Sequence, residues 1–371
     1  MSREHSCAFA PGRVNLIGEH TDYNEGLALP FAIAEGATVR AEKRPPGPAG
    51  EPRIEAHASD ASERDEFALD DIAPASGWRA YVRGTVAELA RAGYPLTGAQ
   101  LWIAGDVPAG AGLSSSAALE VSLCLALIDL CGERLPGTPG EPLGDDERAD
   151  AEDPKDLDER VELARLCARV EGDWVGAHTG LLDQLASLCG APEAALCIDF
   201  RTLHVEPVPL VLGDWRLVVL DSGERHTLAG SGYNERRAEC ARACELLGIA
   251  SLREAQPDSL ERLPEPLRRR AAHVIGENER VREAVAALRA EDLFALAALL
   301  SASHESLREN YEVSTPAVER TVELLLGAGA AGARLVGGGF GGSVLGLFAP
   351  GVTPPPGARE VRPGAGAHVL E

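Results

Sequence analysis

The stretch GDVPAGAGLSSSAALEVSLCLALIDL, residues 105–130, decides how the fold is interpreted. It joins a glycine-rich turn and the consecutive serines Ser114, Ser115 and Ser116 to a run that is apolar on every side of a helix. A helix without a polar face has to be covered all round, so the sequence predicts a central helix packed between a sheet and other helices. A strand-like run at 100–104 precedes the turn and predicts a mixed α and β architecture.

The glycine-rich turn predicts an anion site at the start of that helix. Glycines let the backbone approach a phosphate closely, and the first N–H groups of a helix carry partial positive charge. Serine hydroxyls there also suit Mg²⁺, which prefers oxygen ligands. An ordinary serine N-cap after a flexible loop explains the same residues without any ligand. The only lysines, Lys43 and Lys155, do not follow glycines, which excludes a Gly-Lys-Ser/Thr phosphate loop.

Composition limits the class of protein further. A chain of 371 residues predicts two domains at roughly 150 residues each. The net charge is 35 − 58 = −23, and residues 141–159 alone contain ten acids and two bases. Such acidity argues against nucleic acid as a partner. The segment 133–158 is rich in charge, proline and glycine, so we expect an acidic, solvated insert there.

Cysteine usage and hydropathy indicate a reducing compartment. None of the eight cysteines forms a C-x-x-C pair, and several lie in apolar helical runs, as reduced core cysteines do. The first residues show no apolar segment typical of a secretory signal. The uncharged run 335–352 is too rich in glycine to form a membrane helix. We expect a cytoplasmic monomer without a membrane partner.

Hydrophobic periodicity predicts the other elements. It predicts strands at 7–10, before a Pro11-Gly12 turn, and at 28–39, 194–200, 215–221, 334–336 and 343–348. Helices are predicted at 78–91, 159–175 and 180–189, and over most of 231–327 with breaks near prolines.

The segment PGRVNLIGEHTDYN, residues 11–24, has the composition of a polyhydroxyl-binding loop. Glu19, His20 and Asp22 lie within four residues, and carboxylates beside an imidazole suit the vicinal hydroxyls of a sugar. Arg13 has a guanidinium that can bind phosphate oxygens in a bidentate manner. A metal site and a solvated turn are the alternatives, although one histidine with two acids is an incomplete metal-ligand set.

Two more segments complete the candidate site. Asp183 lies among leucines, twelve residues after Glu171, and therefore needs a charged partner such as Arg13. His178 nearby fits a structural role better than a catalytic one. The second glycine cluster, 337–342, suits either a tight hairpin or a loop that lines a nucleotide pocket.

Taken together and in this order, these segments resemble the galactokinases of the GHMP small-molecule kinase superfamily. PGRVNLIGEHTDYN is similar to the galactokinase signature, PAGAGLSSSAALE to the shared phosphate-binding motif and GARLVGGGFGGS to the third motif. The resemblance covers residues 7–348. Departures are Thr179, Leu182 and Ser343, where Cys, Met and Cys are usual, together with the acidic insert and a short tail.

The resemblance implies an α+β fold of two lobes with the active site in the cleft between them. The N-terminal lobe, residues 1–190, would resemble ribosomal protein S5 domain 2, and the C-terminal lobe, residues 191–371, would be ferredoxin-like. The implied activity is ATP-dependent phosphorylation of the anomeric hydroxyl of D-galactose, with ATP and Mg²⁺ required.

The resemblance also implies a role for individual residues. Asp183 and Arg13 would be catalytic, as proton acceptor and phosphoryl stabiliser, and Ser116 and Glu171 would hold Mg²⁺. The sugar would be bound by Glu19, His20, Thr21, Asp22, Gly180 and Tyr233. The nucleotide would be bound by Gly110, Ala111, Gly112, Leu113, Ser114, Ser115 and Ser116, with Trp78 at the adenine.

Two alternatives to a galactose kinase stay open at this point. Hydroxyl-accepting groups define stereochemistry only through their geometry, so arabinose or N-acetylgalactosamine is also an eligible substrate. A catalytically inactive sensor of sugar and ATP is the alternative from another class. The intact serine motif, Asp183 and Arg13 argue against the sensor.

Overall fold

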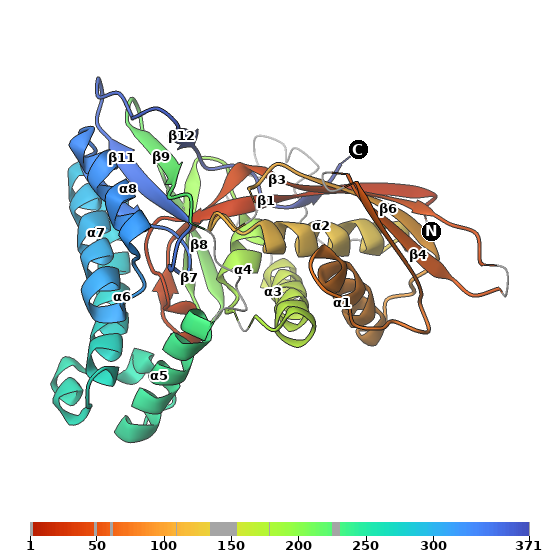
Figure 1. The fold of residues 1–371 in the computed structure, drawn as a ribbon, viewed down its shortest axis with the longest axis horizontal. Helices are drawn as coiled ribbons and strands as arrows, with labels where there is room; N and C mark the ends of the chain where they lie inside the picture. Colours follow the sequence, from red (N-terminus) through yellow and green to blue (C-terminus); the bar gives the residue numbers. More distant parts are fainter. Residues whose placement is uncertain are drawn as a thin grey trace.

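A sheet with helices on one face forms the first half of the chain (Figure 1). The computed structural model describes residues 3–47, 50–59, 62–108, 110–133, 154–177, 179–224 and 231–370. Within these residues the sheet has six strands, and only β4 and β6 pair in parallel. Their order is β13 (His368–Val369), β1 (His5–Asn15), β3 (Pro30–Lys43), β6 (Ala99–Gly105), β4 (Arg53–Ala58) and β5 (Glu63–Ala68).

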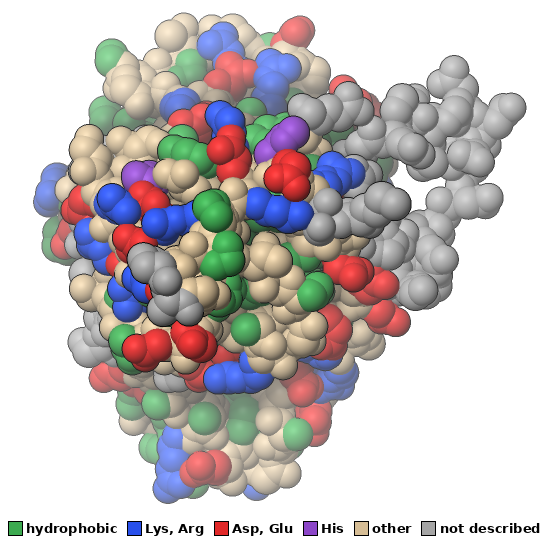
Figure 2. Space-filling model, turned by 90° about the vertical axis from the view of Figure 1, so that its right-hand side faces the viewer, with side chains coloured by type: hydrophobic (Ala, Val, Ile, Leu, Met, Phe, Trp, Pro, Cys, Tyr) green, Lys and Arg blue, Asp and Glu red, His purple; other side chains and the backbone are tan. Residues whose placement is uncertain are grey.

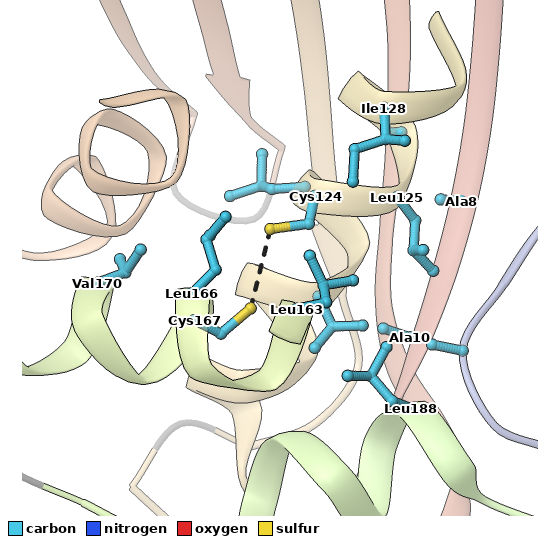
Figure 3. Close-up of a cluster of buried hydrophobic side chains, with 14 of the residues drawn as sticks. Ala8, Ala10, Cys124, Leu125, Ile128, Leu163, Leu166, Cys167, Val170 and Leu188 are labelled. Carbon is cyan, nitrogen blue, oxygen red and sulfur yellow. Dashed lines mark hydrogen bonds between the residues drawn. The ribbon is translucent and has the colours of Figure 1, made fainter. Parts of the chain in front are cut away.

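The covering helices are α1 (Trp78–Arg91), α2 (Ser115–Leu130), α3 (Pro154–Arg169) and α4 (Leu182–Cys189). The central one is α2, which contacts β1 and β3 on one side and the other three helices on the other. Figure 3 shows this core, in which Leu125 and Ile128 of α2 point towards Ala8 of β1. On the side of α3 the buried thiols of Cys124 and Cys167 lie 3.8 Å apart. The predicted central helix is therefore confirmed.

A second layered unit is built from the later part of the chain. Its four-stranded sheet, counted over the described residues, has the order β10 (Gly332–Leu335), β11 (Ser343–Phe348), β9 (Arg216–Asp221) and β12 (Arg359–Val361). Beside it lie α6 (Leu267–Arg289), α7 (Leu293–Ser306) and α8 (Pro316–Gly327), while α5 (Ser231–Leu247) packs on α6 (Figure 1). The predicted α+β architecture is confirmed.

Two strand pairings connect the units. In a small sheet β2 (Leu27–Ala28) pairs with β7 (Ala194–Asp199), which pairs with β8 (His204–Pro209). The last strand, β13, returns to the first sheet and pairs with Ala8 and Phe9 of β1. The division of the chain near residue 190 stays a prediction.

The structure corrects three details of the predicted elements. Pro11 and Gly12 form no turn, because β1 continues through them with a register shift that accommodates the proline. The helix expected from residue 159 begins at Pro154, so the end of the expected acidic loop is helical. Residues 134–153 of that loop lie outside the described part of the chain. Strands β4, β5, β8, β12 and β13 were not predicted; β8 contains two prolines.

Charged side chains of both signs are exposed on the surface. Figure 2 shows one face of the molecule, on which acidic and basic side chains are interspersed. Arg44 and Arg53, for example, both contact Glu66. The described residues include no helix that is both long and apolar enough to span a membrane.

Candidate active site

One cavity of about 390 Å³ brings together the predicted sugar-type loop, both glycine turns and the segment of Asp183. Its wall combines the loop at 19–22, the first glycine turn (residues 110–114), the approach to α4, the start of α5 and the second glycine turn (residues 336–342). The lining consists of Arg13, Glu19, His20, Asp22, Gly110, Gly112, Leu113, Ser114, Ser115, Ser116, Thr179, Gly180, Leu182, Asp183, Gly232, Tyr233, Glu235 and residues 336–342.

An ion pair stands in the wall of this cavity. Arg13 Nε donates to Asp183 Oδ1 at 2.8 Å, and Arg13 Nη2 lies 2.6 Å from the same oxygen. Ser114 Oγ donates to the other carboxylate oxygen, and Arg13 Nη1 donates to Gly112 O at 2.5 Å. The side chain of Arg13 is 6% exposed and that of Asp183 is 21% exposed. The guanidinium is thus fixed in the wall, while the carboxylate stays open to a hydroxyl in the cavity.

Close backbone packing sets the position of Arg13. A Cβ on Gly12 would lie 2.6 Å from Leu113 O, so only glycine lets β1 approach the first glycine turn. The same carbonyl accepts a hydrogen bond from the Arg13 N–H at 3.1 Å. On the other side of the turn, a Cβ on Gly112 would lie 2.7 Å from Val336 O. The two glycine turns are therefore in direct contact, and the second is both a strand connection and part of the cavity wall.

The start of α2 fits an anion site better than an ordinary cap. Ser114 stands at the N-cap position with φ +60°, and its side chain makes no capping hydrogen bond. The first N–H to bond within this helix is that of Ala118, which donates to Ser114 O. The N–H groups of the first turn have no partner within the helix and carry partial positive charge beside the cavity.

Ser116 and Glu171 supply oxygen ligands for a hard cation, but a bound ligand would have to add further oxygens. Glu171, 1% exposed, lies in a π-helical turn at Val170–Val175. Its Oε2 accepts from the Thr179 hydroxyl and from Gln184 Nε2, and the Ser116 hydroxyl also hydrogen-bonds to this carboxyl. Burial raises the pKa of this carboxyl. No cluster of three or more His, Cys, Asp or Glu suited to a metal occurs in the described part of the chain. Phosphate oxygens and water would have to complete a Mg²⁺ shell.

Asp22 and Gly180 lie against each other in the cavity wall. A Cβ on Gly180 would lie only 1.9 Å from Asp22 Oδ2, so the absence of a side chain is what lets Asp22 reach the cavity. The pKa of Asp22 is raised to about 7, mainly by burial and to a smaller extent by the negative charges of Asp183 and Glu19. Near neutral pH this carboxyl can therefore both accept and donate hydrogen bonds.

His20 and Tyr233 line the same end of the cavity, with ring centroids 5.4 Å apart. The backbone of His20 has φ +62°, a strained conformation for a residue with a side chain. Burial lowers the pKa of His20 to about 3, so the imidazole is neutral at neutral pH. Nδ1 lies 2.9 Å from the hydroxyl of Tyr23, and the ring also has a hydrogen bond with the backbone of Gly338 in the second glycine turn.

Glu19 joins the sugar-type loop to the second glycine turn. Its Oε1 accepts from the Gly337 N–H at 2.7 Å and lies 3.4 Å from Nη2 of Arg334, which is fully buried. Arg334 Nη1 in turn donates to the carbonyls of Asn15 and Leu16. Glu19 is thus held between both halves of the site, although it also lines the cavity.

Four residues assigned from the resemblance do not line the cavity: Thr21, Ala111, Trp78 and the buried Glu171. The hydroxyl of Thr21 donates to the carbonyls of Gly18 and Leu27 and closes the loop instead. Ala111 is buried in the apolar core beneath the turn. Trp78 is half-buried at the start of α1, where its indole N–H donates to Glu63 at 2.8 Å. The hydroxyl proton of Thr21 is thus engaged within the loop, and the sugar role of Thr21 and the adenine contact of Trp78 both stay predictions.

The structure also shows site residues that sequence reasoning missed. Tyr23 and Tyr311 lie behind His20, and Arg334 lies behind Glu19. Tyr23 belongs to the signature segment and Arg334 to the third motif, so their places in these motifs were the available signal. Tyr311 lies 291 positions after His20 in the sequence, and only tertiary contact reveals it.

Family profiles match three parts of the chain. The galactokinase galactose-binding signature matches residues 2–43, the GHMP kinase N-terminal domain matches 80–145, and the GHMP kinase C-terminal region matches 284–362. Over 345 residues the chain is 42% identical to the galactokinase of Mycobacterium tuberculosis, covering 91% of this chain and 87% of that protein. The chain belongs to the galactokinase family.

Further galactokinases and two solved structures are also similar to this chain. Galactokinases of Streptomyces coelicolor and Thermotoga petrophila are 41% and 38% identical, each over 91% of this chain, with 82% and 87% of those proteins covered. The crystal structure of Lactococcus lactis galactokinase complexed with galactose superposes with a TM-score of 0.85 at 32% identity, covering 100% of this chain and 96% of that one. Methanococcus jannaschii mevalonate kinase shares the fold at a TM-score of 0.64 and 17% identity, over 97% and 98% of the two chains. The protein is a GHMP-type kinase.

Proposed function

We propose that this galactokinase-family enzyme transfers the γ-phosphoryl group of ATP to the anomeric hydroxyl of D-galactose. The observation that carries the proposal is the cavity in which Asp183, fixed by Arg13 and Ser114, faces both the sugar-type loop and the glycine turns. The L. lactis enzyme, whose structure holds galactose, supports the choice of sugar.

Asp183 is the proton acceptor in this proposal. Its carboxylate is open to the cavity, and its orientation is fixed by the hydrogen bonds from Arg13 and Ser114. As the anomeric oxygen attacks the γ-phosphorus, the hydroxyl proton passes to Asp183 and the bond to the bridging oxygen of ADP breaks. Arg13, with its charge fixed beside the reacting atoms, stabilises the negative charge of the phosphoryl group.

The phosphates occupy the two glycine turns and the N-terminus of α2, where residues 110 and 112–116 line the cavity. Ser116 and Glu171 would hold Mg²⁺, which offsets the charge of the phosphate oxygens when it is bound with ATP. The hydrogen bond between Ser116 and Glu171, which brings the two side chains together, supports this placement.

The sugar lies at the opposite end, against His20, Asp22, Gly180 and Tyr233, with Glu19 in the wall behind them. These groups supply both donors and acceptors, as recognition of vicinal hydroxyls requires. A monomeric enzyme in the cytoplasm remains the expectation from the sequence.

Release of ADP by the purified protein with ATP and Mg²⁺, measured over a panel of aldoses, tests the proposal. Galactose should give the highest kcat/KM, and phosphorus NMR should place the phosphate on the anomeric oxygen. Asp183→Asn serves as the inactive control. A tenfold preference for arabinose or N-acetylgalactosamine would overturn the sugar assignment but not the kinase. Absence of aldose-dependent ADP release from a protein that binds ATP would overturn the activity itself.

A further inference from the structure

The sugar-type loop with its flanking residues, here called the loop 18–27, is held at both ends by α6 from the second half of the chain. Glu277 Oε1 accepts a hydrogen bond from the Gly18 N–H at 3.0 Å, and Asn278 Oδ1 accepts one from the Leu27 N–H at 2.8 Å. Both side chains are buried. Buried backbone N–H groups need such partners, and here a helix about 250 positions away in the sequence supplies them.

Both side chains fit closely against their neighbours. Glu277 Oε1 also accepts from the Ser303 hydroxyl of α7 at 2.6 Å, and Oε2 accepts from Arg280 Nε at 2.7 Å. A Cβ on Gly26 would lie 2.6 Å from Asn278 Oδ1, so a glycine at this position lets Asn278 reach the loop. The two ends of the loop 18–27 are therefore bound to side chains that have little room to move.

A third contact, from His273 of α6, reaches the loop beside His20. His273 Nε2 lies 3.1 Å from the carbonyl oxygen of Glu19, and because a carbonyl only accepts, Nε2 is the donor. Nδ1 of the same ring lies 2.9 Å from the Ser306 hydroxyl at the end of α7, which holds the ring in place. His273 is fully buried and stands four residues before Glu277, on the same face of α6.

The contact with His273 bears on the strained backbone of His20. The φ angle of His20, +62°, is a rotation about its N–Cα bond, and that nitrogen belongs to the peptide group whose carbonyl His273 holds. On the other side, Asn24 Nδ2 donates to the His20 carbonyl at 2.8 Å. A strained conformation persists only where its neighbours enforce it. Here the peptide groups before and after His20 are both fixed, the first of them by α6.

We propose that His273, Glu277 and Asn278 of α6 are positioning residues, which hold the loop 18–27 so that its side chains meet the sugar. Through His273 they also enforce the strained backbone that places the His20 ring in the cavity wall. None of the three lines the cavity, so they act on the sugar only through the loop. The inference rests on the proposed function, because it takes galactose to be the ligand of this loop.

The first test needs no ligand. Asn278→Leu keeps the size of the side chain and removes the acceptor of the Leu27 N–H, so the Leu27 amide should exchange with deuterium at least about tenfold faster than in the wild type. Val322→Ala is the control, because it truncates a buried side chain of α8, which packs on β10 and β11, and should leave this amide unchanged. An unchanged Leu27 amide in Asn278→Leu would overturn the proposal whether or not the protein phosphorylates galactose.

The second test measures binding by calorimetry, with galactose and with ATP separately. His273→Leu has no donor for the Glu19 carbonyl, whereas His273→Gln offers an amide N–H in the region of Nε2. The Kd for galactose should rise at least about tenfold in His273→Leu and return to within about threefold of the wild type in His273→Gln, while the Kd for ATP stays within about threefold in both. Val322→Ala should leave both Kd values unchanged.

Two results of the binding experiment would refute the proposal: an unchanged galactose Kd in His273→Leu, or equal losses of galactose and ATP affinity. If His273→Leu does not fold, Gly26→Ala perturbs the same anchoring from the loop, because its Cβ would meet Asn278 Oδ1, and an unchanged galactose Kd in that variant counts against the proposal in the same way. A wild type that does not bind galactose would refute the proposed function, and the exchange of the Leu27 amide would then decide the anchoring by itself.

Discussion

Asp22 gives the sharpest prediction, because its presence in the cavity costs stability. Its pKa rises from an ordinary value of 3.8 to about 7, mainly through burial and then through the negative charges of Asp183 and Glu19. Between these two pH values the folded protein holds a proton that the unfolded chain has lost. The contribution of Asp22 to the free energy of unfolding therefore falls as pH rises from about 4 to 7 and then levels off.

The magnitude follows from the same shift. At about 1.4 kcal/mol for each pH unit, the rise corresponds to about 4 kcal/mol at pH 8. Asp22 is partly exposed to the cavity, and water there reduces the cost, so we expect about 2 kcal/mol. Asp22→Asn keeps the shape of the side chain and removes the charge. Without ligands, the variant should thus be about 2 kcal/mol more stable than the wild type at about pH 8.

Urea unfolding of both proteins at about pH 5 and about pH 8 measures the effect. The advantage of Asp22→Asn should appear at the higher pH and shrink at the lower one, while the KM for galactose rises at least about tenfold. Asp214→Asn, which removes an exposed acid in a turn, is the control and should show no gain in stability over the wild type at about pH 8. A variant with no advantage at pH 8, or with the same advantage at both pH values, would show that Asp22 is not held at a cost.

Three further predictions concern the remaining parts of the site. Asp183→Asn should lower kcat by roughly 10²-fold at every Mg²⁺ concentration, whereas Glu171→Gln should recover activity as Mg²⁺ is raised. The measurement is kcat against Mg²⁺ concentration for both variants, and the reverse pattern would show that the two roles are exchanged. Gly180→Ala should raise the KM for galactose at least about tenfold and spare that for ATP, because its Cβ displaces Asp22; an unchanged galactose KM would contradict this. Gly112 has φ +76°, and the added Cβ of Gly112→Ala would lie 2.7 Å from Val336 O. The substitution should lower the free energy of unfolding in urea by about 2 kcal/mol and weaken ATP binding. A variant as stable as the wild type would contradict the contact between the turns.

The local sequence was sufficient to predict those elements whose residue pattern lies within a single segment. The all-round apolar run after the serines predicted α2, and the periodicity at 78–91 predicted α1 at its observed bounds. The glycine turns and the loop at 19–22 were also found from the sequence, because glycine content and short-spaced polar groups are properties of a single segment.

Motif matching was less reliable for the direction of a side chain. Thr21 lies within a loop whose other members line the cavity, yet its hydroxyl turns back to Gly18 and Leu27. Pro11 and Gly12 read locally as a turn but continue β1, because pairing with β3 and close contact with Leu113 override the local preference. Neighbours in space, rather than neighbours in sequence, decide such cases.

The sequence by itself therefore determined the central helix, the α+β class and the segments that carry the chemistry. The sequence also offered Arg13 as a partner for Asp183, and the structure places the two in contact across 170 positions. Only the tertiary structure revealed the other groups that act together, Glu19 with Arg334 and His20 with Tyr311. The physical reason is range. Helical periodicity and glycine freedom act over a few residues, whereas ion pairs, buried hydrogen bonds and the orientation of an imidazole depend on atoms that meet only when the chain has folded.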